Sequence, residues 1–338
     1  PSRLSHERSV APRALLIDRS VAIPDTEMLD RLPDDPAWGH ARVAGSGGVM
    51  LHYVRLGRGQ PVLLLHGWPG FWYDWRRVLV PLSGIADVIA PDFRGFGDSE
   101  GPDLPPLKGY TPEVLAEDLL ALLDGLGISR VVVAAYDIGA TVAQTLALRR
   151  PERIRALALF NPAYPGIGER RFDPSVQREF WYQHFHALAW SDRLIAHDRE
   201  TVRLYLEHFY DHWCGRKEAI RERELEAIVD AFARPGAVRA SIAYYRARAA
   251  ARQAQAADAP RESQILQPTV IAWGELDPVI LAAWADRLQD TFLDHELSLL
   301  PGIGHFVPIE APEQTIETIR RALRKTEGSD SVGETETT

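Results

Sequence analysis

Apolar runs rich in Val, Ile and Leu alternate with segments of helical periodicity through the first half of the chain. A strand, a helix and a further strand in succession need crossover connections, which place the strands parallel in one sheet. We therefore predict an α/β protein with a mostly parallel central sheet flanked by helices. The strands are predicted at Val49–Arg55, Pro61–Leu65, Asp87–Ala90, Arg130–Ala135 and Ile154–Phe160.

The helices between these strands carry their own start and stop signals. Thr111 suits a helix N-cap, and Pro112 suits the first turn, where no backbone N–H is needed. Leucines keep the helical period as far as Gly125 and Gly127, which end the helix. A second helix is predicted over Gly139–Arg149, directly after a strand.

The composition of the chain changes after the fifth predicted strand. Trp, Tyr, Phe, His and Arg dominate with helical spacing and no strand pattern, until strand patterns return at Thr269–Gly274 and Asp294–Leu300. A chain of 338 residues is long enough for one large core with an inserted lid. We predict an N-terminal arm at 1–36, a core in two parts at 37–161 and 263–325, a helical lid (cap) domain at 162–262 and a disordered tail at 326–338.

Charge and composition exclude several classes of partner. The formal net charge is -9 and the sequence has no compact Lys/Arg cluster, so no nucleic acid is expected to bind. No apolar run reaches the roughly eighteen residues that span a bilayer, and no signal pattern opens the chain, so we predict a cytoplasmic protein without a membrane partner. Cys214 is the only cysteine, which excludes an internal disulfide. The oligomeric state stays open, a homo-oligomer included.

The segment Ala135–Gly139 lies where a predicted strand meets a predicted helix. A sharp turn there needs small residues around its exposed residue, and Ala135 and Gly139 supply them around Asp137. The helix dipole and the free N–H groups of the first turn would favour an ionised carboxylate at this place. Asp also caps helices well, so this segment alone does not separate a nucleophile from an N-cap.

Two later segments place a carboxylate and a histidine after predicted strands. Trp273–Pro278 carries Asp277 in the loop after a buried strand, and Gly302–Pro308 carries His305 after the last strand. Nucleophile, acid and histidine in this chain order are typical of α/β-hydrolases. The order therefore favours Asp137 as a nucleophile over the N-cap interpretation.

The segment His66–Pro69 directly follows the predicted strand that ends at Leu65. The backbone N–H of Trp68, together with that of Ile138, is predicted to form an oxyanion hole. Gly-Pro turns are common, so this segment supports the hydrolase interpretation without deciding it.

Together these motifs resemble the epoxide hydrolase branch of the α/β-hydrolase superfamily, over about residues 38–324. In that family a His-Gly-X-Pro turn, an aspartate nucleophile, an Asp–His pair and two lid tyrosines recur. The run Phe180–Gln183 resembles the first tyrosine motif and implies a role for Tyr182. The run Ala243–Arg246 resembles the second and implies a role for Tyr245, which directly precedes the arginine.

The resemblance implies an enzyme that converts an epoxide to a vicinal diol. Asp137 would attack an epoxide carbon and form an ester, while Tyr182 and Tyr245 give a proton to the opening ring. Water activated by His305, which Asp277 orients, would then hydrolyse the ester. An epoxide and water are the implied partners, and neither a cofactor nor a metal is implied.

The pocket is predicted to be aromatic and departs from the family pattern in two places. Trp68, Trp181 and Phe306 are predicted to contact the substrate. The family commonly has His before the nucleophile and Trp after it, where this chain has Tyr136 and Ile138. These substitutions change the pocket wall, and the sequence does not define which epoxide enters.

A dehalogenase is the nearest alternative, because it uses the same aspartate nucleophile. The haloacetate type has an arginine directly after the nucleophile, where this chain has Ile138. The haloalkane type usually has Asn or Glu in the place of Trp68. A non-catalytic small-molecule binder with the same fold is an alternative of another class, and the retention of Asp137, Asp277 and His305 argues against it.

Histidines in the predicted lid raise the question of a metal site. His208 and His212 are four residues apart, a spacing that can place both on one helix face, and His184 and His186 lie nearby. No glutamate follows His208 in the protease pattern. We interpret these histidines as lid packing or surface residues.

Overall fold

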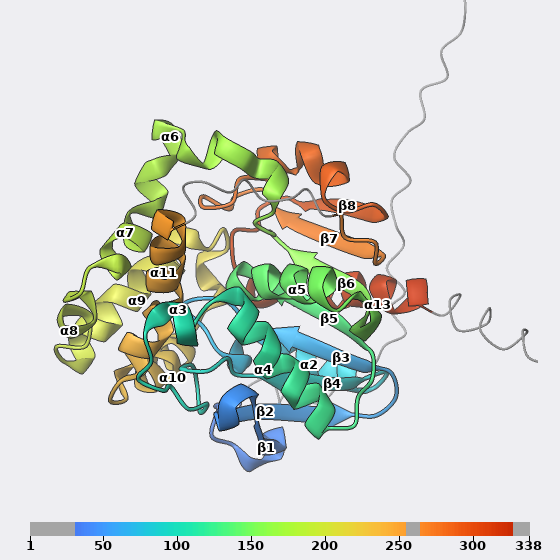
Figure 1. Cartoon of the computed structure of the whole chain (residues 1–338), viewed down its shortest axis with the longest axis horizontal. Helices are drawn as coiled ribbons and strands as arrows, with labels where there is room; N and C mark the ends of the chain where they lie inside the picture. The colour runs from blue at the N-terminus through green and yellow to red at the C-terminus, as the bar shows by residue number, and fades with distance from the viewer. Residues whose placement is uncertain (1–30, 255–263, 327–338) are drawn as a thin grey trace, which may run out of the picture.

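The computed structural model of the chain describes residues 31–254 and 264–326 (Figure 1). Most of the predicted arm, the last residues of the predicted lid and nearly all of the predicted tail therefore lie outside the described residues. Thr326, placed in the tail by the sequence, is the last residue of a helix, and its hydroxyl accepts a hydrogen bond from the Gln60 side chain.

Within the described residues, eight strands form one sheet in the order β1-β2-β4-β3-β5-β6-β7-β8. β1 and β4 both pair with β2 in antiparallel fashion, and every other neighbouring pair is parallel. The predicted α/β class with a mostly parallel sheet is confirmed. The strands are β1 His40–Ala44, β2 Met50–Gly57, β3 Pro61–Leu65, β4 Asp87–Pro91, β5 Val131–Tyr136, β6 Ile154–Phe160, β7 Thr269–Gly274 and β8 His295–Leu300.

Two pairs of helices flank the sheet and contact it on its two faces. One pair consists of α4 and α5, which pack on each other, and the other pair consists of α2 and α13, which also pack on each other. Strands covered on both faces need apolar side chains on both, which explains the continuous apolar runs of β3, β5 and β6. The helices are α2 Arg76–Ser83, α4 Pro112–Gly125, α5 Asp137–Arg149 and α13 Pro312–Thr326.

The edge strand β1 was not predicted from the sequence. It forms a hairpin with β2, and its residues alternate between exposed and half-buried positions. A strand at a sheet edge needs no continuous apolar run, so the pattern that identified the inner strands is missing there.

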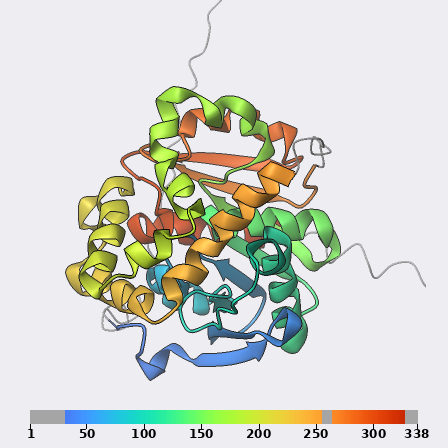
Figure 2. The ribbon, with the colours of Figure 1, turned by 60° about the vertical axis from the view of Figure 1, so that its left-hand side comes forward.

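The described residues between β6 and β7 form helices and no strand. These helices lie together at the carboxyl ends of the parallel strands, on the left of Figure 1 and towards the viewer in Figure 2. We call residues 162–254 the lid. The α-helices of the lid are α6 Pro174–Gln177, α7 Trp181–Ala187, α8 Ser191–Ile195, α9 Arg199–Trp213, α10 Glu222–Ala233 and α11 Ala237–Ala254.

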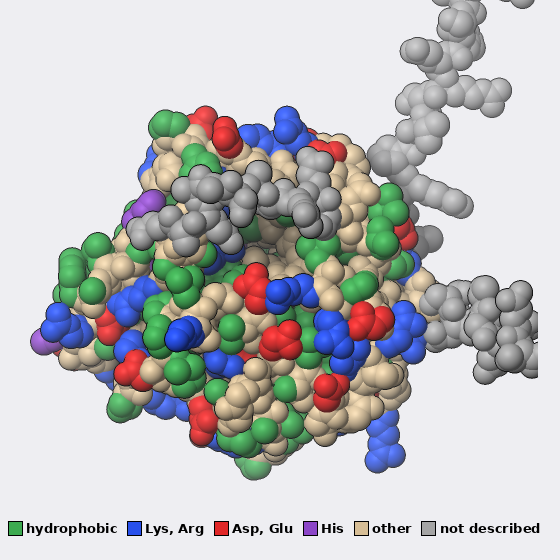
Figure 3. All heavy atoms as spheres, in the orientation of Figure 1, with side chains coloured by type: hydrophobic (Ala, Val, Ile, Leu, Met, Phe, Trp, Pro, Cys, Tyr) green, Lys and Arg blue, Asp and Glu red, His purple; other side chains and the backbone are tan. Residues whose placement is uncertain are grey.

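Charges of both signs are mixed over the surface. On the face shown in Figure 3, the coloured residues include acidic and basic side chains close beside one another. None of the described helices is long and apolar enough to cross a membrane.

The turn from β5 into α5 is sharp and tightly packed. Asp137, the first residue of α5, has φ +48°, a left-handed conformation that is costly for a residue with a side chain. A Cβ atom added to Gly139 would lie 2.5 Å from the carbonyl oxygen of Leu65, and one added to Gly67 would lie 2.5 Å from the Cβ of Asp137. The turn after β3 and the turn after β5 therefore press together, and only glycine fits at the contact.

Substituting Gly139 with alanine should destabilise the fold, because the new methyl group meets backbone atoms that have no room to yield. We expect Gly139→Ala to lower the free energy of unfolding by about 1–3 kcal/mol in urea denaturation. Gly84 is a matched control: its φ is -69° and the nearest atom to an added Cβ is 3.7 Å away. Equal stability of the Gly139→Ala and Gly84→Ala variants would contradict the close contact.

Candidate active site

Three loops at the carboxyl ends of parallel strands bring the predicted catalytic groups together. The loops after β3, β7 and β8 carry Trp68, Asp277 and His305, and the β5–α5 turn carries Asp137. In open α/β sheets this edge is where ligands usually bind.

The Asp137 carboxylate faces two groups that polarise it. The backbone N–H of Trp68 donates to Oδ1 at 2.7 Å, and Nε2 of His305 lies 3.6 Å from Oδ2. The side chain of Asp137 keeps 11% of its surface accessible, while that of His305 keeps none. The carboxylate is thus the part of this pair that a substrate reaches. The hydrogen-bond role predicted for the N–H of Ile138 stays a prediction.

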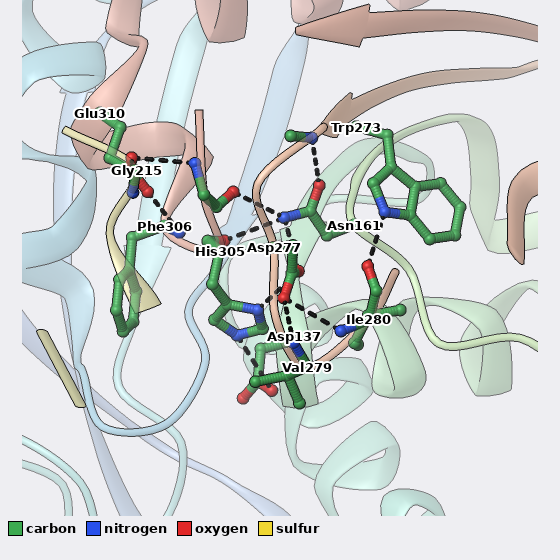
Figure 4. A network of polar contacts seen from close by, with 12 residues as sticks. Asp137, Asn161, Gly215, Trp273, Asp277, Val279, Ile280, His305, Phe306 and Glu310 are labelled. Carbon is green, nitrogen blue, oxygen red and sulfur yellow. Dashed lines mark hydrogen bonds and ion pairs between the residues drawn. The ribbon is translucent and has the colours of Figure 1, made fainter. Parts of the chain in front are cut away.

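Asp277 holds His305 in one orientation (Figure 4). Its Oδ2 lies 2.8 Å from Nδ1 of His305, which turns Nε2 towards Asp137. The N–H groups of Val279 and Ile280 donate to Oδ1 of Asp277 at 2.8 and 3.0 Å. This buried carboxylate is therefore bonded at both oxygens and stays fixed.

Asn161 completes this arrangement and was not identified from the sequence. Its Nδ2 donates to Oδ2 of Asp277 at 2.8 Å and to the carbonyl oxygen of Gly304 at 3.0 Å. Its Oδ1 accepts from the N–H of Gly274 at 2.7 Å. Asn161 follows β6 with φ +43°, and asparagine tolerates this conformation better than most residues. The sequence signal that could have identified Asn161 is its position as a lone polar residue at the end of a buried strand.

The environment of His305 favours its charged form. Burial alone would lower the pKa of His305, but the carboxylates of Asp277 and Asp137 outweigh burial and raise the pKa to about 10. The resting site near neutral pH therefore pairs an imidazolium with the Asp137 carboxylate.

The two tyrosines predicted to act from the lid lie next to each other, close to Asp137 and His305. Tyr182 and Tyr245 are buried, and their ring centroids are 5.5 Å apart. The Tyr182 hydroxyl accepts from Nε2 of Gln183 at 3.2 Å, while the Tyr245 hydroxyl makes no well-formed hydrogen bond among the described residues and has the Tyr182 hydroxyl as a polar neighbour. Burial is the main reason that the pKa of both tyrosines is raised. The negative charge of Asp137 raises the pKa of each tyrosine further. Both hydroxyls are therefore protonated donors at neutral pH.

Aromatic side chains fill the space around Trp68. Its ring stacks on Tyr182 with centroids 5.5 Å apart, and it meets Phe209 and Tyr245 edge to face. Phe306 is buried behind the histidine, with its ring centroid 5.2 Å from that of His305.

Trp181 lies apart from the site. It is 42% exposed, and its ring contacts are with lid residues, among them Phe185 and Phe209. Neighbouring residues on a helix point in different directions, so the turn of α7 that buries Tyr182 carries Trp181 outward. We leave Trp181 out of the proposed site.

Glu310 is a second residue that sequence reasoning missed. It is buried at the end of α12 (Val307–Glu310), and its carboxylate accepts backbone N–H bonds from Gly215, Gly304 and Phe306 at 2.7–3.0 Å (Figure 4). The N–H of His305 also donates to the carbonyl oxygen of Trp213. The end of lid helix α9 and the histidine loop are therefore bonded to each other.

A further buried carboxyl group, that of Asp74, is bonded to the residue before Asp137. The hydroxyl of Tyr136 donates to Oδ2 of Asp74, and burial raises the pKa of Asp74 to about 7. Gly70 is required here, because an added Cβ would lie 1.7 Å from that oxygen. The chain's departure from the family at Tyr136 is thus accommodated by a carboxyl partner.

Two of the four lid histidines considered from the sequence have polar partners. His212 Nε2 lies 2.7 Å from a carboxylate oxygen of Glu179, and His186 Nε2 lies 2.8 Å from the Tyr205 hydroxyl. The described part of the chain contains no group of three or more His, Cys, Asp or Glu side chains arranged to hold a metal.

Comparison with known proteins gives the family. The model of the alpha/beta hydrolase fold family matches residues 60–312, three quarters of the chain. The chain belongs to this α/β-hydrolase fold family. The match spans the three loops and the β5–α5 turn that carry the candidate site.

Its relatives within the family carry the names that the sequence motifs predicted. A protein of Corynebacterium sp. (strain C12) named soluble epoxide hydrolase is 30% identical over 279 residues, covering 80% of this chain and 92% of the relative. Epoxide hydrolase 3 of Xenopus tropicalis is 29% identical and covers 85% of this chain and 78% of its own. The solved structure of epoxide hydrolase CorEH without ligand superposes with a TM-score of 0.68 at 26% identity, covering 84% of this chain and 98% of that one. The predicted resemblance is confirmed.

The raised pKa of His305 makes stability depend on pH. In the unfolded chain the pKa of His305 is near 6.5. The stability that protonated His305 adds to the folded protein is therefore fully present below pH 6.5 and is lost as the pH rises towards 10. We expect the urea midpoint of the wild-type protein to fall across this interval. The His305→Gln variant should show a smaller fall, and equal falls in the two proteins would contradict the assignment.

Proposed function

We propose that the protein hydrolyses an epoxide to a vicinal diol, with Asp137 as the nucleophile. The observation that carries the proposal is the Tyr245 hydroxyl, which is buried beside Tyr182 without a well-formed hydrogen bond and lies near enough to Asp137 for that charge to act on it. A buried polar group without a partner is rare in proteins, and an epoxide oxygen would satisfy this one. The relatives named epoxide hydrolases support the same reaction.

In the first step the Asp137 carboxylate attacks a carbon of the strained ring. A carbon–oxygen bond forms to Asp137 as the ring carbon–oxygen bond breaks, and an alkyl ester results. The departing oxygen remains on the substrate and takes a proton from Tyr182 or Tyr245, which burial keeps protonated. A lone alkoxide in an apolar pocket would be far costlier.

Formation of the ester changes the charge around His305. Of the two carboxylates that raise the pKa of His305, only Asp277 remains ionised once Asp137 is esterified. The pKa of His305 then falls, and its proton becomes available to restore the tyrosine that gave up its own. The imidazole is thereby neutral when the second step needs a base.

In the second step His305 takes a proton from water, and the oxygen of that water attacks the Asp137 carbonyl carbon. The N–H of Trp68, already 2.7 Å from Oδ1, stabilises the tetrahedral oxyanion, together with that of Ile138. Collapse breaks the bond from the Asp137 carbonyl carbon to the ester oxygen, which takes the remaining proton of the added water and leaves as the diol, and the Asp137 carboxylate is restored beside protonated His305. The steps balance in atoms and charge, with one epoxide and one water consumed and no cofactor required.

A single turnover in ¹⁸O-water tests the ester route. We expect the label to appear in the peptide that contains Asp137, because water attacks the carboxyl carbon and leaves one oxygen on the enzyme. Label found only in the diol would exclude the ester. Chloride release from haloalkanes without diol formation from epoxides would instead favour the dehalogenase alternative.

Two variants should separate the steps. Asp137→Asn should form no ester, and His305→Gln should accumulate the ester because the attacking water is no longer activated. Intact-mass spectrometry after mixing with an epoxide such as styrene oxide would show the mass of enzyme plus substrate only for His305→Gln. Accumulation of the ester on Asp137→Asn would assign the nucleophile elsewhere.

Removal of either tyrosine hydroxyl should slow ring opening. We expect Tyr182→Phe and Tyr245→Phe each to lower kcat/KM about 100-fold, and the double variant to lose measurable activity. Tyr205→Phe is the matched control, since the Tyr205 hydroxyl is bonded to His186 within the lid. Equal effects of the Tyr205→Phe and Tyr245→Phe substitutions would show that the loss comes from lid packing.

A further inference from the structure

Two fully buried side chains lie against the two ends of the turn after β3, residues 67–70, which we call the β3 turn. A Cβ atom added to Gly67 would lie 2.9 Å from Cε2 of the Tyr136 ring. A Cβ atom added to Gly70 would lie 1.7 Å from Oδ2 of Asp74. One end of the β3 turn therefore rests on Tyr136, and the other end rests on Asp74.

These two side chains are bonded to each other and to little else. The Tyr136 hydroxyl donates to Oδ2 of Asp74, and Oδ1 of Asp74 has no hydrogen-bond partner among the described residues. By contrast, the buried carboxylates of Asp277 and Glu310 each accept several hydrogen bonds. A pair of apolar side chains of the same shape would avoid the cost of burying a carboxyl group. The pair therefore points to a role other than stability.

The position of the pair connects it to the candidate site. The β3 turn carries the N–H of Trp68, which donates to Oδ1 of Asp137 at 2.7 Å. Tyr136 directly precedes Asp137 in the chain, and its ring centroid lies 6.4 Å from that of His305. Because Tyr136 is fully buried, it can influence the reacting groups only through these neighbours.

We propose that Tyr136 and Asp74 are positioning residues whose hydrogen bond holds the β3 turn where the Trp68 N–H stabilises the oxyanion of ester hydrolysis. This inference rests on the proposed function and concerns its second step. In the first step the Trp68 N–H only orients the Asp137 carboxylate, which is already charged. In the second step negative charge develops on the oxygen that this N–H contacts, so a small displacement of the turn costs more there.

A third side chain also holds the β3 turn and limits the size of the expected effect. The Tyr210 hydroxyl, on lid helix α9, donates to the carbonyl oxygen of Pro69 in the middle of the turn. Loss of the bond between Tyr136 and Asp74 should therefore displace the Trp68 N–H without removing it. We expect about a tenfold loss, smaller than the roughly 100- to 1000-fold loss that follows removal of an oxyanion donor.

A single turnover of styrene oxide, quenched at intervals and followed by intact-mass spectrometry, separates the two steps. In Tyr136→Phe the ring remains and only the bond is lost, so we expect the ester to form within about twofold of the wild-type rate and to be hydrolysed about tenfold more slowly. Tyr164→Phe is the matched control, since it removes a buried hydroxyl bonded to the Trp284 carbonyl, and it should change neither rate. Wild-type hydrolysis in Tyr136→Phe, equal slowing of both steps, or an equal effect of Tyr164→Phe would each overturn the inference.

Substitutions of Asp74 distinguish positioning from stability. Asp74→Asn keeps an oxygen that accepts from Tyr136, so ester hydrolysis should stay within about threefold of wild type. The double variant Tyr136→Phe/Asp74→Leu replaces the pair with apolar side chains of the same shape. It should have a urea midpoint near that of wild type while ester hydrolysis stays about tenfold slow. Slow hydrolysis in Asp74→Asn, or wild-type hydrolysis in the double variant, would contradict the positioning role.

Amide hydrogen exchange gives a readout that does not require turnover. The Trp68 amide hydrogen should exchange about tenfold faster in Tyr136→Phe than in wild type, and at the wild-type rate in Asp74→Asn and Tyr164→Phe. Amides of helix α4 serve as an internal control and should not change. If the wild-type protein forms no ester, the proposed function fails while exchange still tests the positioning. Unchanged exchange at Trp68 in Tyr136→Phe would overturn the inference.

Discussion

The contact between two turns, one after β3 and one after β5, is the constraint on which the rest of the site depends. Asp137 stands in a left-handed conformation, and Gly67 and Gly139 let the two turns approach to van der Waals distance. The same approach brings the N–H of Trp68 to 2.7 Å from the Asp137 carboxylate. Conformational strain at one residue is thereby offset by tight packing and a charge-assisted hydrogen bond.

The cost of burying charge explains why hydrogen-bond donors surround the carboxylates near this contact. A buried carboxylate is stable only when its oxygens are bonded, and the structure meets this need differently for each acid. Asp277 accepts bonds from Asn161 and two backbone N–H groups, and Glu310 accepts several from two separate loops. Asp137 alone keeps an accessible carboxylate, which distinguishes it chemically from its buried neighbours.

Sequence reasoning predicted what is local in the chain. The inner strands were predicted because burial on both faces leaves an unbroken apolar run. Asp137 and Asp277 were found because each follows such a run, and His305 was found because it follows the last predicted strand. Asn161 was missed since its carboxylate partner Asp277 is distant in the sequence, and Glu310 since it joins its own loop to the distant Gly215. The edge strand β1 was missed for the opposite reason, as its half-exposed residues carry no such run.

The bonds that join the lid to the histidine loop have a consequence for motion. The Glu310 carboxylate is shared by Gly215 at the end of α9 and by Gly304 and Phe306 around the histidine, and the His305 N–H is bonded to Trp213. Lifting this part of the lid would break bonds that hold the histidine loop. We therefore expect amide hydrogens in the two segments to exchange with solvent as one cooperative unit, and any opening of this part of the lid to move the histidine loop with it.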